Sequence, residues 1–118
     1  MIRVRRVHDD PSPDDGLRVL VDRLWPRGMT KERAAVDVWL KEVAPSTELR
    51  RAFHGGDLDF ATFGDRYATE LDANPALERL HDLVEEHEVV TLLFAAKDEE
   101  HNHALLLRDR LGQSASGR

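Results

Sequence analysis

The chain has 118 residues, of which 41% are hydrophobic and 34% charged, a composition that suits one compact domain and excludes a disordered chain. It contains no cysteine, so disulfides, thiolate metal ligands and cysteine nucleophiles are excluded. The net charge is −6, but residues 1–33 hold eight basic against six acidic side chains, whereas residues 34–118 hold nine against seventeen. Nucleic-acid binding over the whole surface is therefore disfavoured, and a local basic site in the N-terminal third is favoured.

No segment of the sequence has the pattern of a targeting or membrane-spanning element. The N-terminus, MIRVRRVHDD, lacks the apolar run of a signal peptide, and the longest apolar stretch, VVTLLFAA, is far shorter than a membrane span. We therefore expect a cytoplasmic protein without membrane attachment. No repeat or linker divides the chain, so we expect a single domain over residues 1–111 and a flexible tail over 112–118.

Two strands are predicted at the N-terminus. Residues 2–7 alternate apolar and basic side chains, as a half-buried strand requires. The turn-rich segment DDPSPDDG follows, and residues 17–24 predict the second strand. About ten residues separate the two strands, fewer than a parallel crossover usually needs, so we expect this pair to be antiparallel.

The middle of the chain contains capping signals and one ambiguous segment. Thr30 is a plausible N-cap for a helical turn, and Ser46 for a short helix through Phe53 that ends at Gly55-Gly56. Residues 36–43 fit both a strand and a helix, and their alternation favours the strand.

The second half predicts three helices and a buried strand. The spacing of Phe60, Phe63, Tyr67 and Leu71 indicates an amphipathic helix in which the Tyr67 ring is buried and its hydroxyl bonded. A second helix follows Asn74-Pro75, with Leu77, Leu80 and Val84 on its apolar side, and the last spans residues 101–111. The unbroken apolar run at residues 89–96 predicts a central parallel strand. The resulting fold class is α/β: a small, mostly parallel sheet with an antiparallel N-terminal pair, flanked by helices.

The loop at residues 22–28, DRLWPRG, is the first candidate for chemistry. Its candidate ligand-binding residues are Arg23, Trp25, Arg27 and Gly28. Arg23 and Arg27 carry planar forks suited to carboxylate or phosphate, and Gly28 permits close approach of a ligand to the backbone. The helical turn that opens at Thr30 would add N–H donors. A structural interpretation stands beside this one, in which Arg23 pairs with a structural acid and Trp25 closes an edge of the core.

The loop at residues 95–104, AAKDEEHNHA, is the second candidate, because ligands of open α/β sheets bind beyond the carboxyl ends of the strands. Asp98 and His103 are the candidate catalytic groups and Asn102 a ligand-binding one, with His103 suited to act as a general base near neutral pH. Asp98 also suits the N-cap of the last helix. If both candidate loops follow parallel neighbouring strands, they meet at one edge of the sheet.

A metal site is not indicated. His101 and His103 lie two residues apart, which places them on different sides of a helix, and no HExxH sequence is present. No Walker loop, GxGxxG or GxSxG motif appears either. We therefore expect neither a metal nor a cofactor.

Several strings occur together in a specific order and spacing: DDG-x-RVLVDRLWPRG, WLKEVAPS, F-x3-Y-x2-EL and VTLLFAAKDEEHNHALLL. They resemble the YeaO-like branch of an uncharacterised bacterial family, a domain of unknown function, and the resemblance covers residues 2–111. It implies a small single-domain α/β protein without an assigned activity. Other branches tend to carry a cysteine near the end of the late strand and a Cys-His pair at the following helix. This chain has Ala95-Ala96 and Asn102-His103 there, which argues against a thiol-based mechanism.

Two functions remain open from the sequence, and the enzyme question with them. The first is a small-ligand or nucleotide-like anion-binding domain, with a pocket between residues 22–28 and 97–103 anchored by Arg23. The alternative is a non-catalytic regulatory or interaction module that binds a protein or nucleic-acid partner through the loop that contains Trp25 and the arginines. The sequence does not indicate an oligomeric state.

Overall fold

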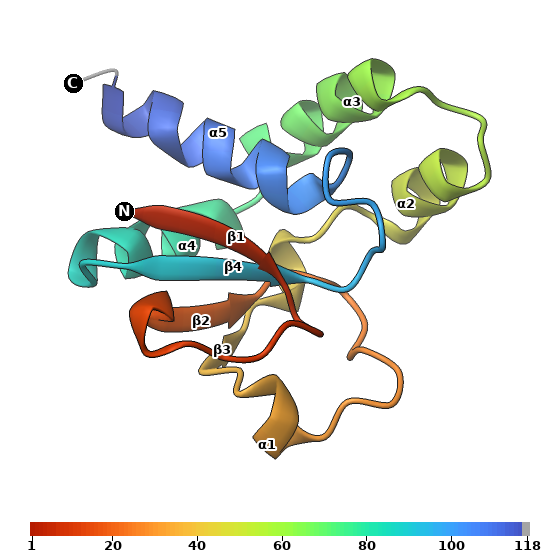
Figure 1. The fold of residues 1–118 in the computed structure, drawn as a ribbon. Helices are drawn as coiled ribbons and strands as arrows, with labels where there is room; N and C mark the ends of the chain where they lie inside the picture. Colours follow the sequence, from red (N-terminus) through yellow and green to blue (C-terminus); the bar gives the residue numbers. More distant parts are fainter. Residues whose placement is uncertain (117–118) are drawn as a thin grey trace.

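The computed structural model describes residues 1–116, and its centre is a four-stranded sheet in the order β1-β4-β2-β3 (Figure 1). Every pair of neighbouring strands is parallel. The strands are β1 (Ile2–Arg6), β2 (Leu17–Leu20), β3 (Val38–Trp39) and β4 (Val90–Phe94). All five residues of β4 are buried, which confirms the central parallel strand predicted from its apolar run.

The prediction of an antiparallel N-terminal pair is wrong. β4 lies between β1 and β2, and all three strands run in the same direction. Returning along a five-residue strand requires about 17 Å. The ten residues between β1 and β2 span roughly twice that distance when extended. The connection can therefore return to the start of the sheet for a parallel β2 without a helix of ordinary length. The regular structure of this connection is the 3-10 turn η1 (Pro13–Asp15). Gly16 follows it with a φ of 61° and lies against Val89, so there is no room for a side chain at this position.

The helices begin near the capping residues that the sequence indicated. Thr30 accepts from Arg33 at the start of α1, and Ser46 accepts from Leu49 at the start of α2. Asn74 accepts from the first residue of α4. The helical elements are α1 (Lys31–Ala34), the 3-10 turn η2 (Lys41–Val43), α2 (Thr47–His54), α3 (Phe60–Asp72), α4 (Ala76–Glu86) and α5 (His103–Ser116).

Two segments differ from their expected form. Residues 36–43 are neither one strand nor one helix, because strand β3 ends at Trp39 and η2 begins at Lys41. The last helix begins two residues later than expected and continues to Ser116, so it passes the expected domain end at 111. Residues 117–118 lie outside the described residues, and the partition into a domain and a flexible tail stays a prediction.

Two hydrophobic clusters cover the two faces of the sheet, as the alternation of side chains along β4 requires. Val90, Leu92 and Phe94 belong to the larger cluster, together with side chains of α3, α4 and α5. Leu93 points to the other face, where the segment after β2 covers it with Met29 and other side chains. The sheet is therefore a middle layer, with the long helices on one face and the segment that contains α1 on the other (Figure 1).

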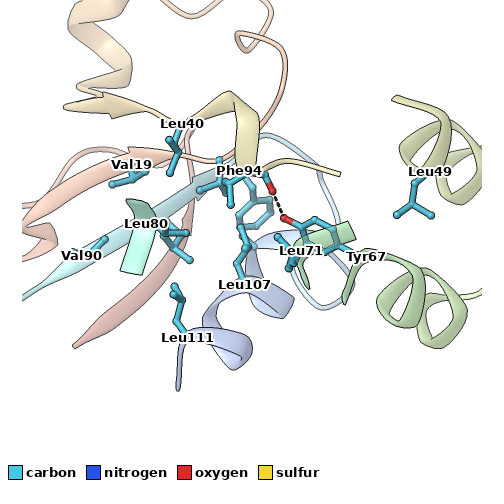
Figure 2. Close-up of a cluster of buried hydrophobic side chains, with 14 of the residues drawn as sticks. Val19, Leu40, Leu49, Tyr67, Leu71, Leu80, Val90, Phe94, Leu107 and Leu111 are labelled. Atoms are coloured by element: carbon cyan, nitrogen blue, oxygen red, sulfur yellow. Dashed lines mark hydrogen bonds between the residues drawn. The ribbon is translucent and has the colours of Figure 1, made fainter. Parts of the chain in front are cut away.

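Tyr67 lies in the larger cluster, close to Leu71 and Leu107 (Figure 2). Its side chain is buried, and its hydroxyl donates to the carbonyl oxygen of Val43 at 2.5 Å. Both parts of the expectation for Tyr67 are thus confirmed. The bond ties α3 to η2 beneath the loop that leads into α2.

Candidate functional site

A pocket of about 410 Å³ opens beyond the carboxyl ends of β2 and β4. The two strands are parallel neighbours, so the loops that follow them meet at one edge of the sheet. Helices α2 and α3, together with the loop before α2, contribute the rest of the wall. The lining residues are Asp22, Arg23, Leu24, Trp25, Pro26, Arg27, Ala44, Pro45, Arg50, Phe53, His54, Phe63, Ala95, Ala96, His101, Asn102 and His103. The expected meeting of the two candidate loops is confirmed.

The pocket is positively charged, although the chain as a whole carries −6, because three arginines line it against one carboxylate. Its lining includes three arginines and three histidines but only one carboxylate, that of Asp22. Such a concentration of one sign in a concave site raises the local concentration of ligands of the opposite sign. The arrangement therefore suits an anion.

The three arginines differ in how far their guanidinium groups are already engaged. Arg23 donates from Nε to the carbonyl of Pro45 at 3.3 Å and from Nη2 to that of Ala44 at 3.1 Å, so much of its fork holds the loop before α2. Arg27 is exposed at the rim. Arg50 has no hydrogen bond or ion pair from its side chain to any described residue, and its Nε is buried. Arg27 likewise has no side-chain hydrogen bond or ion pair to a described residue, so Arg50 differs from it by being partly buried in the pocket wall.

Asp22 and His103 form a close pair at the carboxyl end of β2. Oδ2 of Asp22 accepts from the backbone N–H of Ala95 at 3.0 Å, which connects the ends of β2 and β4. Nε2 of His103 lies 2.9 Å from the carbonyl oxygen of Val21. A carbonyl only accepts, so Nε2 carries the hydrogen, and Nδ1 is the ring nitrogen that gains or loses a proton.

His54 lies at the C-terminal end of α2, where positive groups surround it. Partial burial lowers the pKa of His54 below its ordinary value, and the charges of Arg50 and His103 lower this pKa further. Asp22 opposes the shift. The direction of the shift is what a cluster of cations in one pocket produces, and an anion bound among them would reverse it.

Three of the expected site residues serve local structure. Asn102 is buried, and its Oδ1 accepts from the N–H of Leu105, so Asn102 rather than Asp98 caps α5. Asp98 is exposed outside the pocket lining and accepts from the N–H groups of Glu100 and His101. The bond from the N–H of Glu100 is the main cause of a lowered pKa of Asp98, and the bond from His101 lowers this pKa further. Gly28 has φ 78°, a conformation that favours glycine, and does not line the pocket.

The short helix α1 also lies outside the pocket lining. The N–H donors expected from the helical turn at Thr30 therefore do not face the pocket. Arg23, Trp25, Arg27, Asn102 and His103 do line it, and their roles toward a ligand stay predictions. Trp25 is half-buried, with Nε1 donating to the carbonyl of Met29 at 2.8 Å.

Arg50 and His54 were missed by sequence reasoning. They lie four residues apart on α2, so they share one side of the helix. This spacing was the available signal, but it also fits a solvated surface. Only the docking of α2 against the two loops turns that side toward the pocket.

Within residues 1–116, no group of three or more histidine, aspartate or glutamate side chains is placed to hold a metal ion. None of the helices in this part of the chain combines the length and apolarity needed to span a membrane.

Comparisons with known proteins support one family. The chain is 49% identical over 111 residues to the uncharacterised protein YeaO of Escherichia coli, which covers 93% of the chain and 96% of YeaO. It is 44% identical over 110 residues to the uncharacterised proteins Mb3100c of Mycobacterium bovis and Rv3073c of Mycobacterium tuberculosis, with 93% of the chain and 92% of each relative covered. No solved structure matches significantly. A family model described as the inactive DUF488-N3 subclade matches residues 1–117. The chain therefore belongs to this subclade of the DUF488 family, and its resemblance to the YeaO-like branch is confirmed.

Proposed function

We propose that this protein binds a small anionic ligand in the pocket beyond β2 and β4, without catalysing a reaction on it. The observation that carries the proposal is the lining of the pocket, in which three arginines stand against one aspartate in an acidic chain, and three histidines can add charge or N–H donors. The volume of about 410 Å³ lies within the range of small-molecule pockets. The pocket also combines Arg23 with the imidazole of His103, the combination that favours a ligand site over a partner surface.

Binding without turnover is supported by two features. The matching subclade is described as inactive. The chain also lacks cysteine, and Ala95, Ala96 and Asn102 stand where other branches tend to carry thiols. His103 remains the group best placed to exchange a proton with a ligand, because its Nδ1 has no partner among the described residues. A single imidazole without a nucleophile favours ligand orientation over group transfer.

Arg50 is the anchor that the geometry favours, because its guanidinium is both unengaged and partly buried, whereas that of Arg23 holds the loop before α2 and that of Arg27 is exposed. A charge-assisted hydrogen bond is worth about 1.5–3 kcal/mol, so loss of this group should weaken anion binding roughly ten- to hundredfold. Arg51 provides a matched control, since it is the next residue of the same helix, is exposed and does not line the pocket.

The test is titration with inorganic phosphate and with pyrophosphate, followed by isothermal calorimetry and by NMR chemical shifts of backbone amides. We expect shifts in residues 22–27 and 101–103, a weaker affinity for Arg50→Gln, and the parent affinity for Arg51→Gln. Equal loss in both arginine variants would indicate general electrostatics and overturn the proposed site. Absence of binding to the parent would overturn the proposal itself.

A second candidate function rests on exposed apolar side chains near the same loop. Leu24 is 62% exposed and Trp39 is 39% exposed, and Trp39 contacts Trp25 edge to face with ring centroids 5.5 Å apart. Exposed large apolar groups of this kind mark interaction surfaces. A Leu24→Ser, Trp39→Ser variant that loses a protein partner in cells, while its phosphate binding stays unchanged, would favour an interaction module.

A further inference from the structure

Aromatic rings of α2 and α3 contact the histidines of the pocket. Each of its three histidines contacts one ring of α2 or α3: His54 with Phe53 at 5.4 Å, His101 with Phe60 at 5.1 Å, and His103 with Tyr67 at 6.2 Å between centroids. Each imidazole therefore has an aromatic ring on one side, although His54 and His101 are exposed and only His103 is partly buried.

The aromatic layer is continuous. Phe53 stacks on Phe63 with centroids 4.3 Å apart, and Phe63 stacks on Tyr67 at 6.0 Å. Phe53 and Phe63 themselves line the pocket. Part of the pocket wall is thus the surface of phenyl rings rather than polar atoms.

Further apolar lining comes from the loop at residues 22–28. Leu24 lines the pocket while 62% of its surface is exposed, and Trp25 lines it half-buried. A bare inorganic anion makes no use of these side chains, since it carries no apolar surface to bury. A ligand with an apolar part would remove the exposed surface of Leu24 from water.

The planar side chains that line the pocket indicate what kind of apolar group the ligand carries. Imidazole, phenyl and guanidinium planes all stack favourably on an aromatic ring, whereas an aliphatic chain gains only from burial. The lining supplies imidazoles, phenyl rings and three guanidinium groups in one pocket.

We propose that the ligand is an aryl anion, a phosphate or carboxylate that carries a planar aromatic or heteroaromatic ring, attached directly or through a sugar. The anionic group would lie at Arg50 and the histidines, and the ring between Phe53 and Leu24. This inference rests on the proposed anion-binding function and names its ligand class. The pocket volume of about 410 Å³ accommodates a ligand up to the size of a nucleoside monophosphate.

The test compares probes that share an anion but differ in the ring. We expect phenyl phosphate to bind at least roughly tenfold more tightly than inorganic phosphate, because burial of a ring is worth more than 1.4 kcal/mol. Adenosine 5′-monophosphate and benzoate form two further arms. Tighter binding of the nucleotide would identify a phosphate that carries a heteroaromatic ring through a sugar, and tighter binding of benzoate would identify an aryl carboxylate, both within the proposed class.

Two variants test the position of the ring. Leu24→Ser changes an exposed side chain, so the fold is unaffected, and it should reduce the ratio of phenyl phosphate to phosphate affinity about threefold or more. Phe53→Leu keeps an apolar side chain but removes the ring, and it should reduce the same ratio. Its thermal unfolding midpoint checks that α2 remains docked. The affinity for inorganic phosphate is measured for each variant as well, so that the ratio isolates the contribution of the ligand's ring from any change at the anion site.

Failure of the aryl-anion inference can be distinguished from failure of the proposed anion-binding function. Equal affinities of phenyl phosphate and phosphate for the parent would overturn the aryl-anion inference and leave the anion site standing. An unchanged ratio in both variants would also overturn it. If none of the four probes binds at millimolar concentration, the inference and the proposed function both fall.

Discussion

The Nε2 atom of His103 and the Oδ1 atom of Asp22 lie 3.2 Å apart, yet no hydrogen bond joins them. The N–H of Nε2 is directed at the carbonyl of Val21, so the buried Oδ1 is left without a partner. A desolvated carboxylate oxygen is costly unless positive charge lies nearby. The surrounding arginines and histidines can supply that charge. The carboxylate of Asp22 is therefore stabilised by these groups, and at the same time it weakens their attraction for an anionic ligand.

Asp22→Asn should therefore strengthen anion binding. The side-chain oxygen of asparagine retains the bond from the N–H of Ala95, so we expect the fold to persist. At pH 8, where histidines of ordinary pKa are neutral, removal of one negative charge should raise the affinity for phosphate roughly three- to tenfold. Calorimetry measures the change.

Asp98→Asn is the matched control for this experiment, because Asp98 is exposed and lies outside the pocket lining. It should leave phosphate affinity close to that of the parent. Weaker binding in Asp22→Asn would show that this carboxylate supports the anion site, by orienting His103, rather than opposing it.

The titration of His54 reports on the same charges. We expect its pKa to lie below the ordinary value, because partial burial and the charges of Arg50 and His103 disfavour its protonation. Arg50→Gln should raise the pKa of His54, and saturation with phosphate should raise it as well, whereas Arg51→Gln should not change it. NMR of the ring protons measures each pKa separately.

The sign of the accompanying stability effect follows from linkage. With a lowered pKa in the folded state, the unfolded chain takes up the proton first as the pH falls below the ordinary histidine pKa of about 6.5. His54 should therefore contribute a loss of stability on acidification through this window. If phosphate binding lowers the pKa of His54, the anion does not lie near this residue.

Much of the fold was predictable where local chemistry decides it. Thr30 and Ser46 cap helices because their hydroxyls satisfy N–H groups that any helix leaves free. β4 was identified because a strand buried on both faces needs an unbroken apolar run. The meeting of the two candidate loops followed from β2 and β4 being parallel neighbours.

The incorrect predictions concern features that depend on how distant segments of the chain pack together. The antiparallel pairing of β1 and β2 was inferred from the length of the loop between them. That length gives no sign that β4, which begins 84 residues after the end of β1, inserts between β1 and β2. Asp98 and Asn102 both suit an N-cap, and only the actual start of α5 selects Asn102. Arg50 joins the pocket because α2 docks beside the loops, an arrangement without a local sequence signal.

Tyr67→Phe should destabilise the protein, although the two side chains differ by one oxygen. Burial raises the pKa of the Tyr67 hydroxyl well above its ordinary value, with the charges of Glu70 and Asp22 adding to the effect. The hydroxyl thus remains a donor to Val43 across the ordinary pH range. Its removal leaves a buried carbonyl oxygen unpaired, at a cost of about 1–3 kcal/mol. Urea unfolding measures the loss.

Tyr67→Ala should cost more, about 3 kcal/mol or above, because the cavity left by the ring adds to the lost bond. Tyr67→Phe and Tyr67→Ala together separate the hydrogen bond from the packing. A Tyr67→Phe variant as stable as the parent would mean that another group or water satisfies Val43.

Asp15 should be the carboxylate on which stability depends most at acidic pH. It is fully buried, and Arg18 and Arg5 bond to it at 2.5 and 3.1 Å. Burial alone would raise the pKa of Asp15, but bonds from the Ser12 backbone and the two arginines hold this pKa below its ordinary value. A lowered pKa in the folded state means that the stabilisation is complete above the unfolded value of 3.8 and is lost as the pH falls through the folded value.

Asp15→Ala leaves the buried Arg18 guanidinium without its carboxylate partner, although its bonds to the carbonyls of Ala34 and Ala35 remain, and this should cost about 3–5 kcal/mol near neutral pH. Asp14→Ala is the matched control, since the side chain of Asp14 is exposed and its backbone bond to Arg3 is retained. Chemical unfolding between pH 3 and pH 7 should show that the deficit of Asp15→Ala narrows toward the acid end, because the parent then protonates Asp15 and loses the same interaction. A deficit that stays constant with pH would mean that Asp15 acts through packing and the capping of η1 rather than through its charge.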